Sequence, residues 1–155
     1  MRTPVLVCIL AASWLASSAR GASCTVAASS IGFGNYPSIL NQSRDSNGTL
    51  DVHCTGTAGE HVNIAISVNY GGGSYSSRTL SSANSSLSYN LYVDANRTQV
   101  WGDGTGGTSV IQGSFDLDGT GSYNHTYDYF GRITAGQNAA KAGGYSDQMT
   151  VTMTY

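Results

Sequence analysis

The stretch that decides the fold is YSDQMTVTMTY, residues 145–155, which closes the printed sequence. In this stretch Met149, Val151, Met153 and Tyr155 alternate with polar residues and fall on one side of an extended chain. The two-residue period predicts a β-strand with one buried and one exposed face. A half-buried strand that stands last, with no later residues to cover it, requires an explanation.

Other segments of the chain show the same alternation and are separated by turn-forming residues. Loops are predicted where glycine, serine, asparagine and aspartate accumulate, at 69–77, 101–107 and 116–125. The alanine-rich segment 135–144 is too short, and too closely bracketed by glycine, to predict a helix. About seven short strands in one domain predict an all-β sandwich; they cover residues 24–28, 49–54, 61–68, 87–94, 109–115, 126–133 and 149–155.

The N-terminal segment has the composition of an export signal. Arg2 precedes an apolar run from Val5 to Leu15, and small residues follow it. This run is too short to span a membrane. We predict a signal peptide over residues 1–22, cut after Gly21 or after Ala22, and a single secreted domain over residues 23–155.

Two cysteines, Cys24 and Cys54, follow the predicted signal peptide. An oxidising compartment favours a disulfide between them. The alternative is a metal site with two cysteine ligands, but the chain lacks the closely spaced cysteine or histidine pairs that such sites use. We predict a disulfide, and neither a metal nor a cofactor.

The charge of the mature chain argues against two classes of partner. Without the signal peptide, five cationic and nine acidic residues remain, so the formal net charge is five minus nine, or −4. No basic cluster is left to bind nucleic acid or an anionic membrane surface. Charged residues make up 10% of the sequence, against about 25% in average domains.

The sequence offers no recognisable catalytic site. His53 and His61 flank a predicted turn and His125 lies in a predicted loop, so each is interpreted as a surface histidine. Asp116 and Asp118 begin like a calcium-binding loop, but tyrosine stands at the twelfth position, where such a loop carries glutamate. We predict that the protein is not an enzyme.

Several stretches together resemble the spore coat protein U domain family, whose members include subunits of archaic chaperone–usher pili. The matching stretches run in family order across nearly all of the predicted mature chain. They are CTV (24–26), IGFGNY (31–36), LDVHCTG (50–56), LSYNLYVDANRTQVWGDGTGG (87–107), YFGRITAGQNAAKAGGYSD (129–147) and MTVTMTY (149–155).

The resemblance implies an incomplete immunoglobulin-like β-sandwich that lacks its final strand. In this family a periplasmic chaperone first lends a strand to the open groove, and a neighbouring pilus subunit replaces it during assembly at an outer-membrane usher. Unpaired backbone groups then gain partners, and alternate apolar side chains fill the groove. The strand with Met149, Val151, Met153 and Tyr155 would border this acceptor groove. The family also implies that basic chaperone residues hold the subunit's terminal carboxylate.

One departure from the family concerns the strand that a subunit donates. Spanning a groove of ordinary strand length takes roughly ten to fifteen residues at about 3.3 Å each. After signal cleavage only one or two residues precede Cys24, so this chain would accept a strand without giving one. That property fits the tip of the fibre, the end that is assembled first. The chain would then be a minor tip-associated subunit or a one-domain adhesin.

Aromatic residues in two predicted loops are candidates for surface contact. They are Tyr70 and Tyr75 in 69–77 and Trp101 in the glycine-rich loop 101–107. For Trp101 we prefer the alternative that it packs over the core. The expected route is export through the periplasm to a cell-surface pilus. The other functions considered are a stand-alone secreted module that binds carbohydrate or a surface, and a hydrolase, for which no nucleophile–base pair is found.

Overall fold

The computed structural model describes residues 21–155, so residues 1–20 of the predicted signal peptide lie outside the described residues. Within residues 21–155 no helix is long and apolar enough to cross a membrane. The elements are β1 (Ser23–Ala28), η1 (Ser38–Leu40), β2 (Arg44–Thr55), β3 (His61–Val68), β4 (Gly73–Ser74), β5 (Ser77–Ser82), β6 (Ser85–Tyr92), β7 (Ile111–Asp116), β8 (Ser122–Ile133) and β9 (Val151–Thr154).

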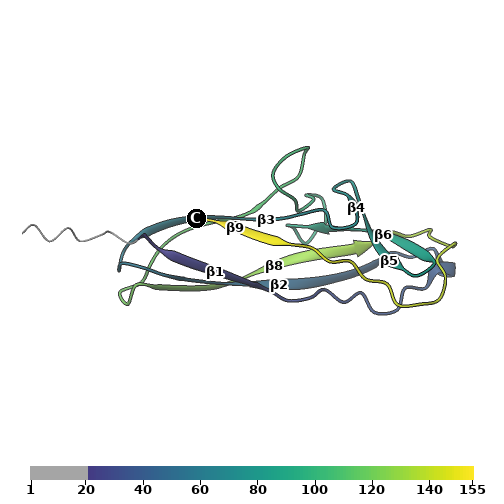
Figure 1. Ribbon diagram of the computed structural model, residues 1–155, viewed down its shortest axis with the longest axis horizontal. Helices are drawn as coiled ribbons and strands as arrows, with labels where there is room; N and C mark the ends of the chain where they lie inside the picture. The colour runs from purple at the N-terminus through teal and green to yellow at the C-terminus, as the bar shows by residue number, and fades with distance from the viewer. Residues whose placement is uncertain (1–20) are drawn as a thin grey trace, which may run out of the picture.

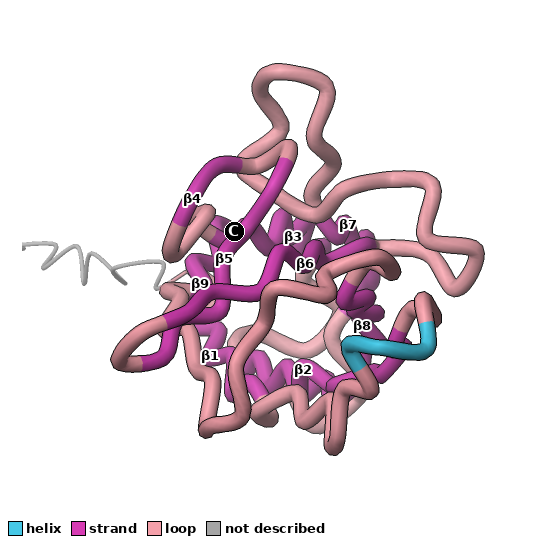
Figure 2. The backbone as a smooth tube through the Cα atoms, turned by 90° about the vertical axis from the view of Figure 1, so that its right-hand side faces the viewer, coloured by secondary structure: helices cyan, strands magenta, loops and turns pink. Residues whose placement is uncertain are grey.

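The strands form two sheets of an immunoglobulin-like sandwich, which confirms the predicted fold class. One sheet has the order β1-β2-β8-β6-β5-β4 and the other the order β7-β3-β9, and neighbouring strands are antiparallel. Figure 1 shows the molecule elongated along these strands. Seen end-on in Figure 2, β1 and β2 lie on one side of the interior and β3 and β7 on the other.

The core lies between the sheets, because each strand turns its alternate apolar residues inward. β3 is an example, with Val62, Ile64, Ile66 and Val68 buried. Its bounds are those that the sequence predicted. Trp101 is fully buried and tilts against Tyr129 at 5.1 Å between ring centroids. Its indole Nε1 donates to the Ile66 carbonyl at 2.9 Å.

Residues 21–155 form nine strands where about seven were predicted. β4 and most of β5 come from a glycine- and serine-rich stretch, and one core-facing position of β5 holds Arg78, which interrupts the apolar alternation. The predicted loop 116–125 was too long: residues 117–121 form the turn, but Asp116 ends β7 and residues 122–125 belong to β8. Because β8 already begins at Ser122, His125 lies within a strand.

The predicted disulfide is present and joins the two strands at one edge of the larger sheet. Cys24 and Cys54 are register partners in β1 and β2, and both are buried. β1 is an edge strand that pairs with β2 alone. The disulfide therefore fixes β1 to its neighbour where the sheet would otherwise fray most easily.

Removing this disulfide is expected to destabilise the domain substantially. The cysteines are separated by 30 positions, and a cross-link over such a loop stabilises a fold by about 3.5 kcal/mol in the chain-entropy model. We expect the double substitution Cys24→Ser, Cys54→Ser to lower the free energy of unfolding by that amount, measured by urea denaturation. Wild-type protein under a reducing agent serves as the matched control. Equal urea midpoints for the oxidised, reduced and substituted forms would contradict the prediction.

One lateral side of the sandwich is closed by aromatic side chains. β8 pairs with β2 along its full length, but with β6 only over its last four residues. Beside the remainder of β8, Tyr123 stacks on Phe115 of β7 at 3.4 Å between ring centroids. The Tyr127 hydroxyl lies so close to Gly113 that a Cβ there would clash with it. These contacts bridge the two sheets on this side.

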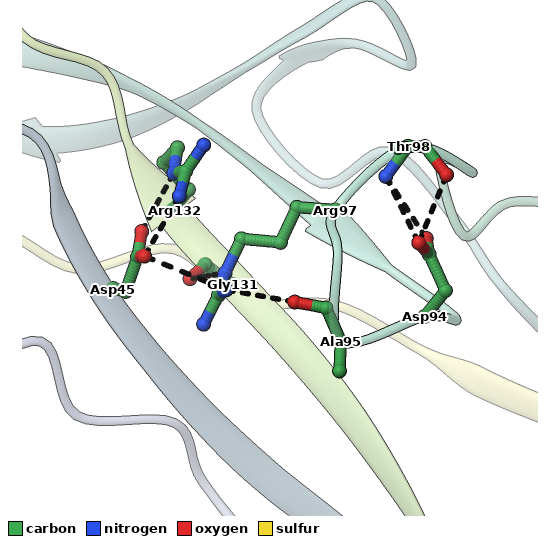
Figure 3. Close-up of polar contacts among 7 residues, drawn as sticks. All are labelled: Asp45, Asp94, Ala95, Arg97, Thr98, Gly131 and Arg132. Atoms are coloured by element: carbon green, nitrogen blue, oxygen red, sulfur yellow. Dashed lines mark hydrogen bonds and ion pairs between the residues drawn. The ribbon is translucent and has the colours of Figure 1, made fainter.

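An ion-pair network ties the outer face of the larger sheet to the loop after β6 (Figure 3). Arg132 donates two hydrogen bonds to Asp45, at 2.6 and 2.8 Å. The Arg97 guanidinium lies 3.4 Å from the same carboxylate and also donates to the Gly131 carbonyl. The hydrogen bond from Arg132 is the main reason why the pKa of Asp45 is lowered.

Candidate functional site

β9 presents an open edge on the smaller sheet. Asn69 N donates to the Thr150 carbonyl at 3.1 Å, and Asn69 Oδ1 accepts from Thr150 N at 2.9 Å, so the backbone groups of Thr150 face β3. Successive residues of a strand point these groups in opposite directions. The N–H and C=O groups of Val151 and Met153 therefore face away from β3. β9 is the last strand of its sheet, so no described strand pairs with them.

A groove of about 1280 Å³ lies beside β9 and opens between the two sheets. One bank is the chain that follows β1, residues 28–40, and the other is the chain that leads into β9, residues 140–149 and 151. Figure 2 shows β9 between β3 and β1. The floor consists of core side chains from both sheets: Val68, Leu80, Leu87, Tyr89, Leu91, Trp101, Tyr129 and Ile133.

Of the four residues predicted to border the groove, Met149 and Val151 line it, whereas Met153 and Tyr155 do not. Met149, Val151 and Met153 are partly buried and pack against the core, while the threonines between them are exposed. Tyr155 falls on the same side of the alternation as these three residues, but 59% of its surface is exposed. The apolar face of the terminal strand is thus only partly covered by the protein itself.

Asp147 positions the chain that leads into β9. Its carboxylate accepts hydrogen bonds from the Tyr89 hydroxyl at 2.7 Å and from Gly72 N at 3.0 Å. Burial, and then the bond to Asp147, raise the pKa of Tyr89. Ser146 adds a backbone bridge to Ser81 of β5. This bank is therefore anchored to the larger sheet before the chain crosses to the smaller one.

A buried arginine connects the two sheets behind the same bank. Arg78 is fully buried and donates to the Trp101 carbonyl at 2.7 Å, to the Asn69 carbonyl at 3.2 Å and to Asn90 Oδ1. Its guanidinium also lies 5.4 Å from the centroid of the Tyr75 ring. Burial lowers the pKa of Arg78. Sequence reasoning missed this residue, because an isolated arginine beside a glycine-rich loop normally lies at the surface.

The opposite bank is irregular in backbone conformation and is held by side-chain contacts and hydrogen bonds. Phe33 packs edge-on against Tyr89, and both Phe33 and Ile31 lie against Gly131, where a side chain would displace them. Arg44 Nε donates to the Phe33 carbonyl at 3.1 Å. Farther along, the groove is bordered by η1, whose Ile39 is 84% exposed. The groove therefore combines an apolar floor with a mixed rim, which includes the exposed apolar side chains of η1.

The candidate surface-contact residues have different environments. Tyr70 is half exposed and lies edge-on to Tyr75, with 5.6 Å between the ring centroids. The Tyr75 hydroxyl donates to the Val68 carbonyl, so this ring is partly used in packing. Trp101 is fully buried. Surface contact was the wrong interpretation for Trp101, and the preferred interpretation, packing over the core, describes it.

Among the described residues, His61 lies between a serine and an aspartate, a pair of contacts that sequence reasoning missed: Ser114 Oγ lies 3.2 Å from His61 Nε2, and Asp116 contacts the other ring nitrogen. All three side chains are exposed on the sheet surface, so they lack the enclosing pocket of an active site. His61 Nδ1 lies 2.6 Å from Asp116 Oδ1 on the exposed end of β3, and His53 Nδ1 lies 2.6 Å from Asn124 Oδ1. The Asp118 carboxylate accepts hydrogen bonds within its own turn, which lowers its pKa. Among residues 21–155, no group of three or more histidine, cysteine, aspartate or glutamate side chains is placed to hold a metal ion.

Comparison with known proteins agrees with this architecture. A search of curated proteins finds no match. One similar solved structure is described as a CsuC–CsuE chaperone–tip adhesion subunit pre-assembly complex from archaic chaperone–usher Csu pili of Acinetobacter baumannii. The TM-score is 0.56 at 16% sequence identity, and the match covers 86% of this chain but 40% of the other. This likeness supports the fold.

The family comparison covers the sandwich almost completely. The model of the Spore Coat Protein U domain matches residues 10–152, which include β1 to β8, both banks of the groove and the first part of β9. The chain therefore belongs to the Spore Coat Protein U domain family.

Proposed function

We propose that the protein is a secreted structural or adhesive subunit of an archaic chaperone–usher pilus, and that its groove accepts a β-strand from another polypeptide. The open edge of β9 beside an apolar groove is the observation that carries this proposal. An added strand would pair with the free backbone groups of Val151 and Met153. Its alternate apolar side chains would cover the exposed part of the core.

The family and the similar structure support a sequence of partners. A periplasmic chaperone would lend the first strand, and a neighbouring subunit would replace it at an outer-membrane usher. The similar solved structure is itself described as a chaperone–subunit complex. The family assignment supports a structural role rather than an enzymatic one. The half-exposed Tyr70, beside Tyr75, is the described feature best placed for adhesive contact.

Co-expression with a chaperone tests the proposal. We expect the protein exported alone to be degraded or to aggregate, because a bare apolar edge invites association. Together with the periplasmic chaperone of its own pilus system, it should purify as a soluble one-to-one complex, measured by size-exclusion chromatography and light scattering. A high yield of stable monomer alone, together with no chaperone complex, would contradict the proposal.

A proline substitution provides a matched control on β9 itself. Val151 N points to the open edge, so Val151→Pro removes a donor that an incoming strand needs and leaves the bonds to β3 in place. We expect this variant to lose capture by the chaperone. Thr154→Ala, which changes an exposed side chain on the same strand, should retain it.

A further inference from the structure

We propose that Glu60 is the seat of the mature N-terminus, meaning that its carboxylate binds the terminal ammonium group, and that export cleavage occurs between Gly21 and Ala22. Glu60 is the single glutamate of the sequence. It stands at the end of the turn that joins β2 to β3, and its carboxylate is directed at the chain just ahead of β1. Glu60 Oε1 lies 2.9 Å from Ala22 N, and Glu60 Oε2 accepts from Thr57 N at 3.0 Å.

The residues around Ala22 form a closely packed niche for it. Ala22 is partly buried and packs against the core, whereas Gly21 is exposed. A Cβ at Gly56 would come within 2.6 Å of Glu60 Oε2 and 3.1 Å of Ala22 Cα, so only glycine leaves room for both groups. The Glu60 main chain is fixed as well, because its carbonyl accepts from Leu117 N at 2.9 Å. The carboxylate is thus held in place rather than free to swing into solvent.

Cleavage after Gly21 fits this niche better than the alternative. Hydrolysis of the Gly21–Ala22 peptide bond by a signal peptidase consumes one water and leaves a carboxylate on Gly21 and an ammonium group on Ala22. The new ammonium then lies at hydrogen-bond distance from a carboxylate, which is a stronger interaction than an amide makes. Cleavage after Ala22 would remove this partner of Glu60 and leave Ser23, the first residue of β1, as the terminus.

The seat has a consequence for assembly, which rests on the proposed function. A chain that begins at Ala22 has its first residue bound to Glu60 and its third, Cys24, bonded to Cys54. It then has no N-terminal arm to lend to another subunit. Such a subunit accepts a strand at its groove and ends the fibre at its other side.

Two measurements test the seat. The intact mass of the exported, oxidised protein should correspond to residues 22–155 with one disulfide. Glu60→Gln should lower the melting temperature of a form that begins at Ala22 by about 3–6 °C, a loss of one charge-assisted hydrogen bond. The same substitution should change a form that begins at Ser23 by less than about 1 °C. Asp128→Asn, which removes another exposed carboxylate, is the control and should change neither form.

Two outcomes would overturn the seat. One is an exported protein that begins at Ser23 or that keeps residues ahead of Ala22. The other is an equal effect of Glu60→Gln in the two forms. Both readouts are independent of strand capture, so the acceptor function can fail while the seat holds, and the seat can fail while the groove still accepts a strand.

Discussion

A strand supplied in the same chain will raise the melting temperature of the domain by about 10–20 °C. The design appends nine residues that alternate valine and threonine after Tyr155, joined by a short Asn-Gly turn so that the new strand runs antiparallel to β9. Three or four valines would enter the groove and cover its floor. Each buried side chain contributes about 1.5–3 kcal/mol before the ordering entropy of the strand is subtracted.

The control for this design keeps its length and turn but replaces the valines with aspartates. It retains backbone pairing in principle, but it would place charges on an apolar floor, so no stabilisation is expected. Differential scanning calorimetry of the two fusions and of the unmodified protein provides the comparison. If the valine and aspartate fusions melt at the same temperature, the groove does not accept a strand.

Arg78→Ala will cost about 3–5 kcal/mol of unfolding free energy. The substitution leaves the carbonyls of Asn69 and Trp101 and the side chain of Asn90 without their buried donor, and it opens a cavity beneath Tyr75. Because Asn69 also holds Thr150, the approach to β9 should loosen as well. Urea denaturation measures the first effect, and hydrogen exchange at Thr150 the second.

Arg132→Ala is the matched control for Arg78→Ala. Arg132 also makes hydrogen bonds through its guanidinium, but its partner Asp45 is a partly exposed carboxylate at the surface. Ion pairs of this kind contribute up to about 1 kcal/mol. A loss at Arg78 as small as the loss at Arg132 would show that the buried guanidinium does not organise the two sheets.

Much of the sandwich could be predicted, because its strands alternate strictly. The alternation of apolar residues predicts β3 from Val62 to Val68 and the terminal strand from Met149 to Met153, because the core requires apolar side chains at every second position. β5 was missed for the same reason: of its inward positions, one is Leu80 but the other is Arg78, whose burial depends on carbonyl groups of Asn69 and Trp101 outside the strand.

The candidate site could be predicted only in part. The apolar face of β9 is visible in the sequence, and so is the family pattern. The opposite bank is not, because residues 28–40 follow neither period beyond β1. Their place beside the groove depends on long-range contacts such as those of Phe33 with Tyr89 and Gly131. The Asp147–Tyr89 bond likewise joins residues 58 positions apart.

The aromatic side chains that close the other lateral side limit how many strands the sandwich can accept. The gap between β7 and β8 is blocked by Phe115, Tyr123 and Tyr127. The described sandwich therefore offers an incoming strand one open gap between its sheets, or seam, rather than two. A unit with a single seam takes up a single strand. An assembly could therefore not branch at this domain or be crosslinked through it into a mesh.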